Sequence, residues 1–270
     1  MLAKYGDQAR ILAGGVDLLP RMRRGAIKAG HVVNISKIPG LSDITSEGAK
    51  GMKFGAMATL HALETSKDLQ KNYPALYEAI HQITSYQAKC MGTAIGNICV
   101  ATPASDVATV LLALDASLVI EGAAGKRTEP AEKFFVDYQR TSLKKDELVT
   151  GVVLPAFQSD TGMAFINLVR THADIAKVTV AVSITVKNGV SSNVRIAMGS
   201  VAPTVIRARK AEAVLENNKV SSELIGKAAE TAAGETSAIS DVRSTAEYRK
   251  EVTRILVARA LNKALEEKTA

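Results

Sequence analysis

The 270-residue sequence contains no tryptophan, only two cysteines and few aromatic side chains. Cys90 and Cys99 cannot build a disulfide scaffold or a four-thiolate cluster, and their spacing matches no zinc motif. The four histidines are scattered, which argues against a histidine-based metal centre. Scarce aromatic residues leave little surface on which the bases of a single-stranded nucleic acid could stack. No apolar run reaches the roughly 18 residues that a transmembrane helix needs, so we expect none.

Several familiar catalytic and nucleotide-binding motifs are also missing from the sequence. It has no Gly-x-Gly-x-x-Gly fingerprint of a nicotinamide-binding fold and no Gly-x-x-x-x-Gly-Lys-Ser/Thr phosphate loop of a nucleotide hydrolase. Serine, histidine and aspartate do not occur in the order of a known nucleophile–base–acid set. Residues 1–7 lack the apolar core of a secretory signal, so we expect a cytoplasmic protein.

The formal net charge is +7, which first suggests a nucleic-acid-binding protein. Most basic residues are interleaved with acidic ones, however, and a dispersed excess is weak support for that function. One local basic cluster is formed by Arg21, Arg23, Arg24, Lys28 and His31. We therefore assign the basic character to docking of an acidic protein partner or to holding an anionic cofactor.

The pattern of apolar residues changes near residues 155–161, where Pro155, Gln158, Ser159 and Asp160 gather. Before this point strands and helices alternate, and we expect two α/β lobes within residues 1–158. Periodicity predicts strands at 9–13, 31–35, 116–121 and 147–154, and helices at 59–68, 74–83 and 106–114.

Residues 159–270 have a different organisation. Alternating apolar residues predict strands at 162–170, 177–187 and 192–200, with a hairpin turn at Asn188-Gly189. Helical patterns follow at 207–215, 221–233 and 246–267. Three strands followed by helices indicate an α+β domain whose helices pack on one face of an antiparallel sheet.

Two glycine-containing segments carry the strongest functional signal. The first is Ala13-Gly14-Gly15-Val16-Asp17-Leu18, where adjacent glycines with positive φ could turn their amide groups toward an anion. The second is residues 92–106, in which Thr93, Gly96, Asn97 and Thr102 add hydroxyl and amide donors. We interpret both as loops that hold the pyrophosphate of a dinucleotide. Asp106 either caps the helix that follows or accepts a hydrogen bond from a ribose-type hydroxyl.

With these segments in order, the sequence resembles the FAD-binding (medium) subunit of the molybdenum hydroxylases, the family of xanthine dehydrogenase and aerobic carbon monoxide dehydrogenase. The family's Ala-Gly-Gly-x-Asp-Leu segment is similar to residues 13–18, and its Thr-Ile-Gly-Gly-Asn and Pro-x-x-Asp segments are similar to 93–97 and 103–106. Further similar pieces are Asp174–Val178, Ala202-Pro203-Thr204, Arg207-Ala208, Asp241-Val242-Arg243 and Glu247-Tyr248-Arg249.

The resemblance implies an α+β protein with a two-lobed FAD-binding domain of the PCMH type, followed by the C-terminal domain described above. It also implies an oxidoreductase complex. A molybdopterin subunit would act on the substrate, and an iron–sulfur subunit with 2Fe–2S clusters would pass electrons to the FAD of this chain. The flavin would deliver them to an acceptor such as NAD, because it converts single-electron input into two-electron output.

The family also implies roles for individual residues, with no catalytic side chain and no metal ion on this chain. The first segment and Thr93–Asn97 would wrap the pyrophosphate, Asp106 would reach the ribityl or adenine side, and Val149 would lie near the ring system. The complete set of expected FAD contacts is Ile11, Leu12, Ala13, Gly14, Gly15, Val16, Asp17, Leu18, Thr93, Ala94, Ile95, Gly96, Asn97, Thr102, Asp106 and Val149.

Departures from the family pattern suggest an alternative, a structural subunit with weakened or lost flavin binding. Ile95 replaces a glycine, and a β-branched side chain there would resist positive φ and crowd the phosphate. Val16 stands where a polar residue is usual, and Asn167 where a lysine is frequent. Family members also usually begin with an additional strand and most of a helix. A third hypothesis is a stand-alone flavin reductase. The sequence contains no recognisable group of substrate-binding residues that would support it.

Overall fold

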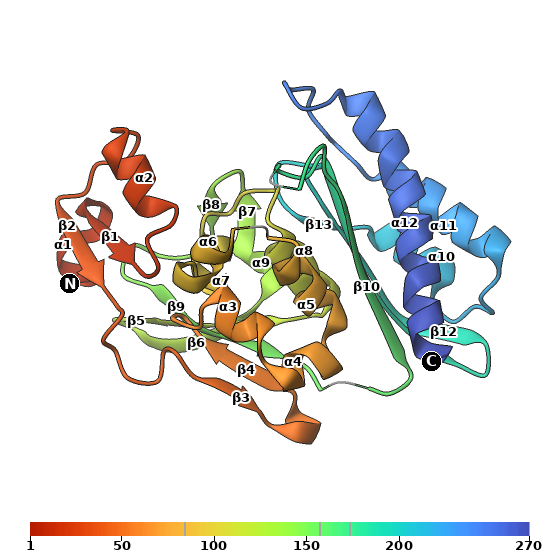
Figure 1. Ribbon diagram of the computed structural model, residues 1–270, viewed down its shortest axis with the longest axis horizontal. Helices are drawn as coiled ribbons and strands as arrows, with labels where there is room; N and C mark the ends of the chain where they lie inside the picture. The colour runs from red at the N-terminus through yellow and green to blue at the C-terminus, as the bar shows by residue number, and fades with distance from the viewer. Residues whose placement is uncertain (84, 157, 173, 270) are drawn as a thin grey trace.

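The computed structural model describes residues 1–83, 85–156, 158–172 and 174–269. An N-terminal lobe, a central sheet with its helices and a C-terminal sheet with its helices follow one another along the longest axis (Figure 1). The domain boundary expected near 155–161 includes residue 157, which lies outside the described residues.

The N-terminal lobe is built on two parallel strands, with Ala9 opposite His31. Tyr5 stacks on His31, with 3.6 Å between the ring centroids. The two predicted strands are therefore present, and their parallel pairing requires the crossover that α2 provides. The elements are α1 (Leu2–Tyr5), a 3-10 turn (Gly6–Gln8), β1 (Ala9–Leu12), α2 (Leu18–Arg23) and β2 (His31–Asn34).

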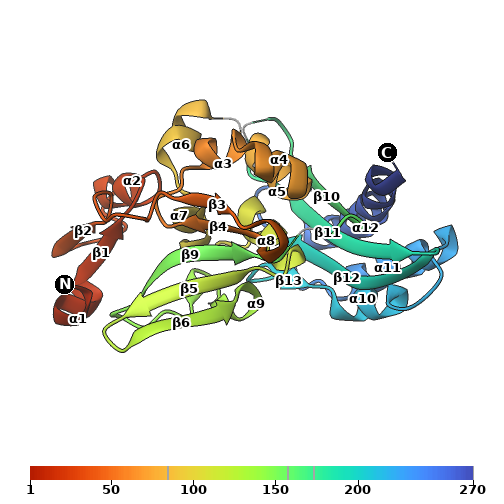
Figure 2. The same ribbon diagram turned by 90° about the horizontal axis from the view of Figure 1, so that it is seen from below.

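The central lobe contains a five-stranded antiparallel sheet in the order β3-β4-β9-β5-β6. Helices α3, α5 and α7 lie on one face of this sheet (Figure 2). The strands are β3 (Ile44–Ser46), β4 (Met52–Gly55), β5 (Ser117–Gly122), β6 (Gly125–Pro130) and β9 (Leu148–Leu154), and a small hairpin joins β7 (Phe135–Asp137) to β8 (Arg140–Thr141). The helices are α3 (Leu60–Glu64), α4 (Lys67–Asn72), α5 (Pro74–His81), α6 (Tyr86–Met91), α7 (Ala94–Cys99), α8 (Asp106–Ala113) and α9 (Ala131–Phe134), with a 3-10 turn at Gly48–Lys50.

The helix predicted at 59–68 is wrong in one respect, because it is two helices. The first helix ends at Glu64, and Ser66 caps the second, its hydroxyl accepting from the Leu69 N–H at 3.4 Å. Serine competes for backbone hydrogen bonds in this way and so favours helix starts over helix interiors.

The C-terminal part is an antiparallel sheet in the order β10-β11-β12-β13. Asn188 and Gly189 both have positive φ, 52° and 78°, so the predicted hairpin turn between β11 and β12 is confirmed. Helices α10, α11 and α12 pack on one face of this sheet, as expected. The elements are β10 (Thr161–Leu168), β11 (Val178–Lys187), β12 (Val190–Gly199), β13 (Ile206–Arg207), α10 (Arg209–Leu215), α11 (Ser222–Gly234) and α12 (Ala246–Thr269).

The opposite face of that sheet packs against the central lobe. Met163, Phe165 and Ala197 are buried in the same apolar core as α8 and the central sheet. At the closest approach, a Cβ on Gly199 would lie 2.6 Å from Thr109 Oγ1, so only glycine fits there. The C-terminal sheet therefore lies between two apolar cores, one shared with the central lobe and one formed with its own helices.

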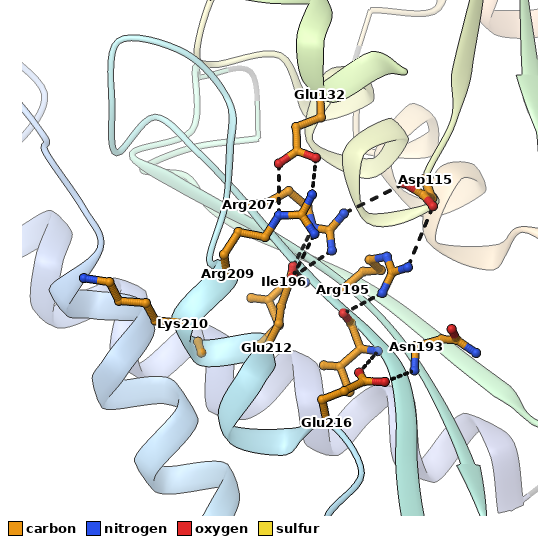
Figure 3. Close-up of polar contacts among 12 residues, drawn as sticks. Asp115, Glu132, Asn193, Arg195, Ile196, Arg207, Arg209, Lys210, Glu212 and Glu216 are labelled. Carbon is orange, nitrogen blue, oxygen red and sulfur yellow. Dashed lines mark hydrogen bonds and ion pairs between the residues drawn. The ribbon is translucent and has the colours of Figure 1, made fainter. Parts of the chain in front are cut away.

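A polar network borders this shared core (Figure 3). The buried Arg207 donates to Glu212 at 2.7 Å, and Glu212 also accepts the Ile196 N–H at 2.9 Å. Arg209 forms a two-bonded ion pair with Glu132 of the central lobe. The exposed pair adds little stability in water, so the apolar contacts dominate the joint.

Candidate functional site

A cavity of about 1200 Å³ lies where the N-terminal lobe, the central helices and the β10–β11 connection meet. This exceeds the roughly 300–1,000 Å³ typical of drug-sized ligands, as an extended dinucleotide requires. Every segment that the sequence singled out for a cofactor contributes to its wall. All the predicted contacts except Leu12 and Ala94 line it, and these are Ile11, Ala13, Gly14, Gly15, Val16, Asp17, Leu18, Thr93, Ile95, Gly96, Asn97, Thr102, Asp106 and Val149.

The two glycines of the first segment serve different purposes. Gly15 has a φ of +73°, which glycine adopts without strain. Gly14 lacks positive φ, so the expectation of positive φ at both adjacent glycines is wrong for Gly14. A Cβ on Gly14 would lie 1.8 Å from the backbone oxygen of Met91, which no side chain can do. Gly14 therefore lets the first segment touch the second.

The second segment is not a loop throughout, because residues 94–99 form helix α7. Thr93 caps this helix, its hydroxyl accepting from the Gly96 N–H at 2.9 Å. The density of glycine and threonine suggested irregular backbone, but a threonine cap followed by apolar residues is also a helix start. Cavity-lining Thr93, Gly96 and Asn97 are consequently held on a regular element.

The helix also changes the meaning of Ile95. Its side chain is 4% exposed within the apolar core, and its φ is not positive. The expectation that isoleucine would meet a strained backbone here is therefore wrong. Ala94, 1% exposed, is buried behind the cavity wall, and Leu12 is the last residue of β1, its carbonyl accepting the Ile35 N–H at 3.1 Å.

Ser105, rather than Asp106, caps helix α8. The Ser105 hydroxyl accepts from the Ala108 N–H at 3.0 Å and donates to Asn97 Oδ1 at 2.5 Å. This second bond ties α8 to α7 and leaves the amide NH₂ of Asn97 available to donate. The helix-cap interpretation of Asp106 is thus wrong, because the residue before it has taken that position.

Asp106 is the least satisfied polar group of the cavity wall. Its Oδ1 is inaccessible to solvent and has no hydrogen-bond partner among the described residues. Burial raises the pKa of Asp106 to about 7, and the neighbouring Asn167 side chain opposes part of that increase. An unpaired buried oxygen at a cavity wall is typical of a group that waits for a ligand.

Two parts of the wall had no cofactor motif in the sequence. The end of α5 contributes Glu78, His81 and Gln82, and the β10–β11 connection contributes His172, Asp174 and Ile175. The similarity of Asp174–Val178 to the family pattern was a signal for the connection. No signal marked the end of α5, whose residues reach the cavity only through the packing of helices.

A partly buried cluster of charged groups lies beside the end of α5. The Lys89 ammonium lies 2.6 Å from Glu64 Oε1, and His81 Nδ1 lies 2.9 Å from the same oxygen. Burial opposes ionisation of Glu64, but the hydrogen bonds from Lys89 and His81 outweigh it and lower the pKa of Glu64. The cluster fixes α3, α5 and α6 to one another.

The described residues contain no group of three or more histidine, cysteine, aspartate or glutamate side chains that could hold a metal ion. Among the helices of the same described ranges, none is long and apolar enough to cross a membrane.

Comparisons with known proteins agree with this geometry. Residues 1–157 match the family described as FAD binding domain in molybdopterin dehydrogenase, and residues 163–264 match the CO dehydrogenase flavoprotein C-terminal domain. The carbon monoxide dehydrogenase medium chain of Hydrogenophaga pseudoflava is 33% identical over 264 residues, 98% of this chain and 92% of that protein.

A solved structure of carbon monoxide dehydrogenase from Hydrogenophaga pseudoflava, lacking the Mo-pyranopterin moiety of the molybdenum cofactor, superposes with a TM-score of 0.95. It is 35% identical and covers 98% of this chain and 92% of its own. The xanthine dehydrogenase FAD-binding subunit of Escherichia coli O157:H7 is 28% identical over 260 residues, 96% of this chain and 89% of that subunit. The chain therefore belongs to the family of FAD-binding medium subunits of the molybdenum hydroxylases.

Proposed function

We propose that this chain holds FAD in the 1200 Å³ cavity and passes electrons from an iron–sulfur partner subunit to an acceptor such as NAD. The observation that carries the proposal is that two segments far apart in the sequence, 13–18 and 92–106, line one cavity and meet where Gly14 packs against Met91 and Gly92. Such a meeting is what a ligand held across a central pyrophosphate requires.

In this proposal the pyrophosphate lies between the two segments. The backbone of Gly14 and Gly15 lines the cavity, and its N–H groups would donate to the phosphate from one side. The hydroxyls of Thr93 and Thr102 and the amide of Asn97 supply donors from the opposite side. Arg21 also lines the cavity and pairs with Asp17 at 3.3 Å, which keeps that carboxylate from facing an anion unneutralised.

Asp106 and Asn167 face the remainder of the cofactor. A buried carboxyl group with a pKa of about 7 is largely neutral at slightly acidic pH and can then donate a hydrogen bond. It would find its missing partner in a hydroxyl, carbonyl or ring nitrogen of the bound flavin. Val149, 3% exposed on β9, gives the ring system an apolar contact.

When bound, FAD supplies the conversion between one-electron and two-electron transfer. The chain supplies binding, orientation and exclusion of water around it. The relatives are named medium chains or FAD-binding subunits, which supports a place for this chain in a complex with iron–sulfur and molybdopterin subunits.

The alternative is a structural subunit of the same kind of complex that has lost flavin binding. The part of its argument that assumed a strained backbone is wrong, because Ile95 lies in a helix without positive φ. Val16, 45% exposed, and Asn167 both line the cavity and are departures that still favour it.

Electron transfer in the purified complex tests the proposal. The complex is reduced anaerobically with its substrate or with dithionite, and the flavin band of the visible spectrum is followed before and after adding NAD. We expect bleaching on reduction and recovery on adding NAD or another acceptor. A complex that turns over while its spectrum contains no flavin band would favour the structural subunit.

A further inference from the structure

The N-terminal lobe, residues 1–34, is only loosely attached to the rest of the molecule. It lies at one end of the molecule in both views (Figures 1 and 2). Ala9 is the one buried residue among residues 1–34, all of which the structure describes. Within the described ranges, no backbone hydrogen bond joins residues 1–34 to residues beyond 43. The lobe therefore depends on side-chain contacts to stay in place.

This lobe also supplies one wall of the flavin cavity. Arg10, Ile11, the segment 13–18, Arg21 and Ile27 line the cavity from the lobe, and the central lobe and the β10–β11 connection supply the remaining lining. A ligand held between the segments 13–18 and 92–106 consequently contacts two parts of the chain. It enters and leaves most readily when the lobe moves away from the central lobe.

Two polar side-chain contacts join the lobe to the part of the chain described beyond residue 43. Lys145 pairs with Asp7, but the two side chains are 72% and 71% exposed, so this pair contributes almost nothing. In the other contact, Arg21 Nη2 of α2 donates to Gln139 Oε1 at 3.0 Å. The Arg21 side chain is 26% exposed, and both partners line the cavity. The Arg21–Gln139 bond is therefore the polar contact that holds the lobe closed beside the cavity.

The backbone at Gln139 gives independent support for a special role of this residue. Gln139 lies in the turn between β7 and β8 with a φ of +55°, a conformation that favours glycine or asparagine over glutamine. The Gln139 N–H donates to the Ala101 carbonyl at 2.9 Å, which fixes the turn. A glycine in this turn would have no side chain to bond Arg21. The strained backbone therefore accompanies a side chain that reaches the N-terminal lobe.

The chain that connects the lobe to the central sheet has the features of a hinge. Residues 36–40 are all exposed and lie between the buried Ile35 and Leu41. The Leu41 carbonyl accepts the Met57 N–H at 2.6 Å, so the connection is fixed to the central lobe from Leu41 onward. Gly40, just before this point, has a φ of +80°. A few exposed residues between two fixed ones can absorb the backbone rotation of a moving lobe.

We propose that the N-terminal lobe is a hinged cover of the cavity, which turns about residues 36–40 to admit and release a dinucleotide and is held closed by the Arg21–Gln139 bond. The identity of the ligand, FAD, rests on the proposed function. The hinge, the bond and the cavity wall all belong to this chain, so the cover needs no partner subunit to operate.

A cover of this kind has a kinetic signature that a ligand contact lacks. The Arg21–Gln139 bond joins two protein groups, so it forms in the free chain and in the loaded chain alike. Its strength sets how often the cavity opens in both states. Weakening the bond therefore accelerates uptake and release by the same factor and leaves the dissociation constant nearly unchanged. Loss of a direct contact with the ligand raises the dissociation constant instead.

The test measures both rates on the full chain. Uptake is followed by stopped-flow fluorescence of FAD, and release by exchange of bound FAD against an excess of isotope-labelled FAD. Gln139→Gly removes the bonding side chain at a position whose φ suits glycine, so the midpoint of urea unfolding should not fall. We expect both rates to rise by about threefold to tenfold, the effect of losing one hydrogen bond of ordinary strength, with a nearly constant dissociation constant.

Two further variants sharpen this test. Gln139→Glu places a carboxylate against the Arg21 guanidinium, so it should strengthen the bond and slow both uptake and release. The added negative charge alone would speed the release of an anionic ligand, which makes slower release specific to the cover. The control is Asn217→Gly, an exposed residue between α10 and α11 with a φ of +58°. It does not line the cavity, so it should leave both rates unchanged.

Two results with a chain that binds FAD would overturn the cover and leave the proposed function intact. In the first, Gln139→Gly takes up and releases FAD at the wild-type rates. In the second, Gln139→Gly releases FAD faster without faster uptake and with a raised dissociation constant, which would make Gln139 a direct contact of the cofactor. A wild-type chain that takes up no FAD would instead contradict the proposed function itself, and the cover with it.

Discussion

Asp106 and Glu147 carry opposite pKa shifts within one lobe, and their different surroundings account for this. Asp106 lies at the start of α8 with one oxygen buried and unpartnered, and burial raises its pKa to about 7. Glu147 precedes β9 and receives two bonds from the Arg127 guanidinium at 2.9 Å. The hydrogen bonds from Arg127 outweigh burial and lower the pKa of Glu147 to about 2.

Asp106 makes the stability of the flavin-free protein depend on pH. The folded protein retains a proton on Asp106 between pH 3.8 and about 7 that the unfolded chain releases, so the free energy of unfolding falls as pH rises through this range. Asp106→Asn removes this pH dependence of the free energy of unfolding. The wild type should lose about 1.4 kcal/mol per pH unit relative to the variant. Urea unfolding between pH 4 and 8 measures it, and parallel curves for the two proteins would contradict it.

Glu147 gives the opposite dependence. Its contribution is present above the ordinary pKa of 4.5 and is lost as pH falls toward about 2. Because Arg127 is 35% exposed, Glu147→Gln should cost only about 1–2 kcal/mol at pH 7. The control is Glu121→Gln, whose pair with Lys126 is exposed and should contribute almost nothing. Equal losses from the two substitutions in urea unfolding at pH 7 would argue against this difference.

At the scale of elements, the sequence predicted the strands and the two cofactor segments better than the local backbone between them. Alternation and glycine spacing located β9, β11 and the first segment. The sequence did not predict helix α7, because a glycine at position 96 favours a loop. In the structure Gly96 has no positive φ and lies within the helix. The end of α5 was missed as a cavity wall for a different reason. His81 reaches the cavity through the packing of helices, and it contacts Glu64 of α3, a residue that no local pattern connects to it.

The junction of the two segments depends on Gly14. Gly14→Ala places a methyl group 1.8 Å from the Met91 carbonyl oxygen, so the segments must separate. We expect a loss of about 1–3 kcal/mol in the free energy of unfolding, together with weaker FAD binding in fluorescence titration.

Gly226→Ala is the matched control for this substitution. A Cβ there meets nothing within 4 Å, in the middle of α11, so alanine should stabilise by about 0.5–1 kcal/mol and leave FAD binding unchanged. Wild-type affinity for FAD in Gly14→Ala would show that the cavity does not need the close contact.

At the scale of the whole molecule, the sequence suggested two domains, and the structure joins them through one apolar core. Phe165 of β10 is 1% exposed and belongs to the core of the central lobe. The residues that face across this joint come from strands whose alternation predicts burial. That alternation does not identify the helix against which they pack, which depends on the tertiary arrangement.

The shared core predicts cooperative unfolding. Phe165→Ala should lower the free energy of unfolding by about 3–5 kcal/mol, and the protein should still unfold in a single transition. Release of bound flavin, followed by fluorescence, should then coincide with loss of helical circular dichroism. Two separated transitions in the wild type would mean that the parts are independently stable.

The cofactor content of the purified protein tests most directly whether this chain carries FAD. Its visible spectrum is recorded, the cofactor is released by heat, and the supernatant is identified by chromatography and mass spectrometry. We expect an oxidised flavin spectrum and close to one FAD per chain. A colourless protein that remains without flavin after incubation with excess FAD would contradict it.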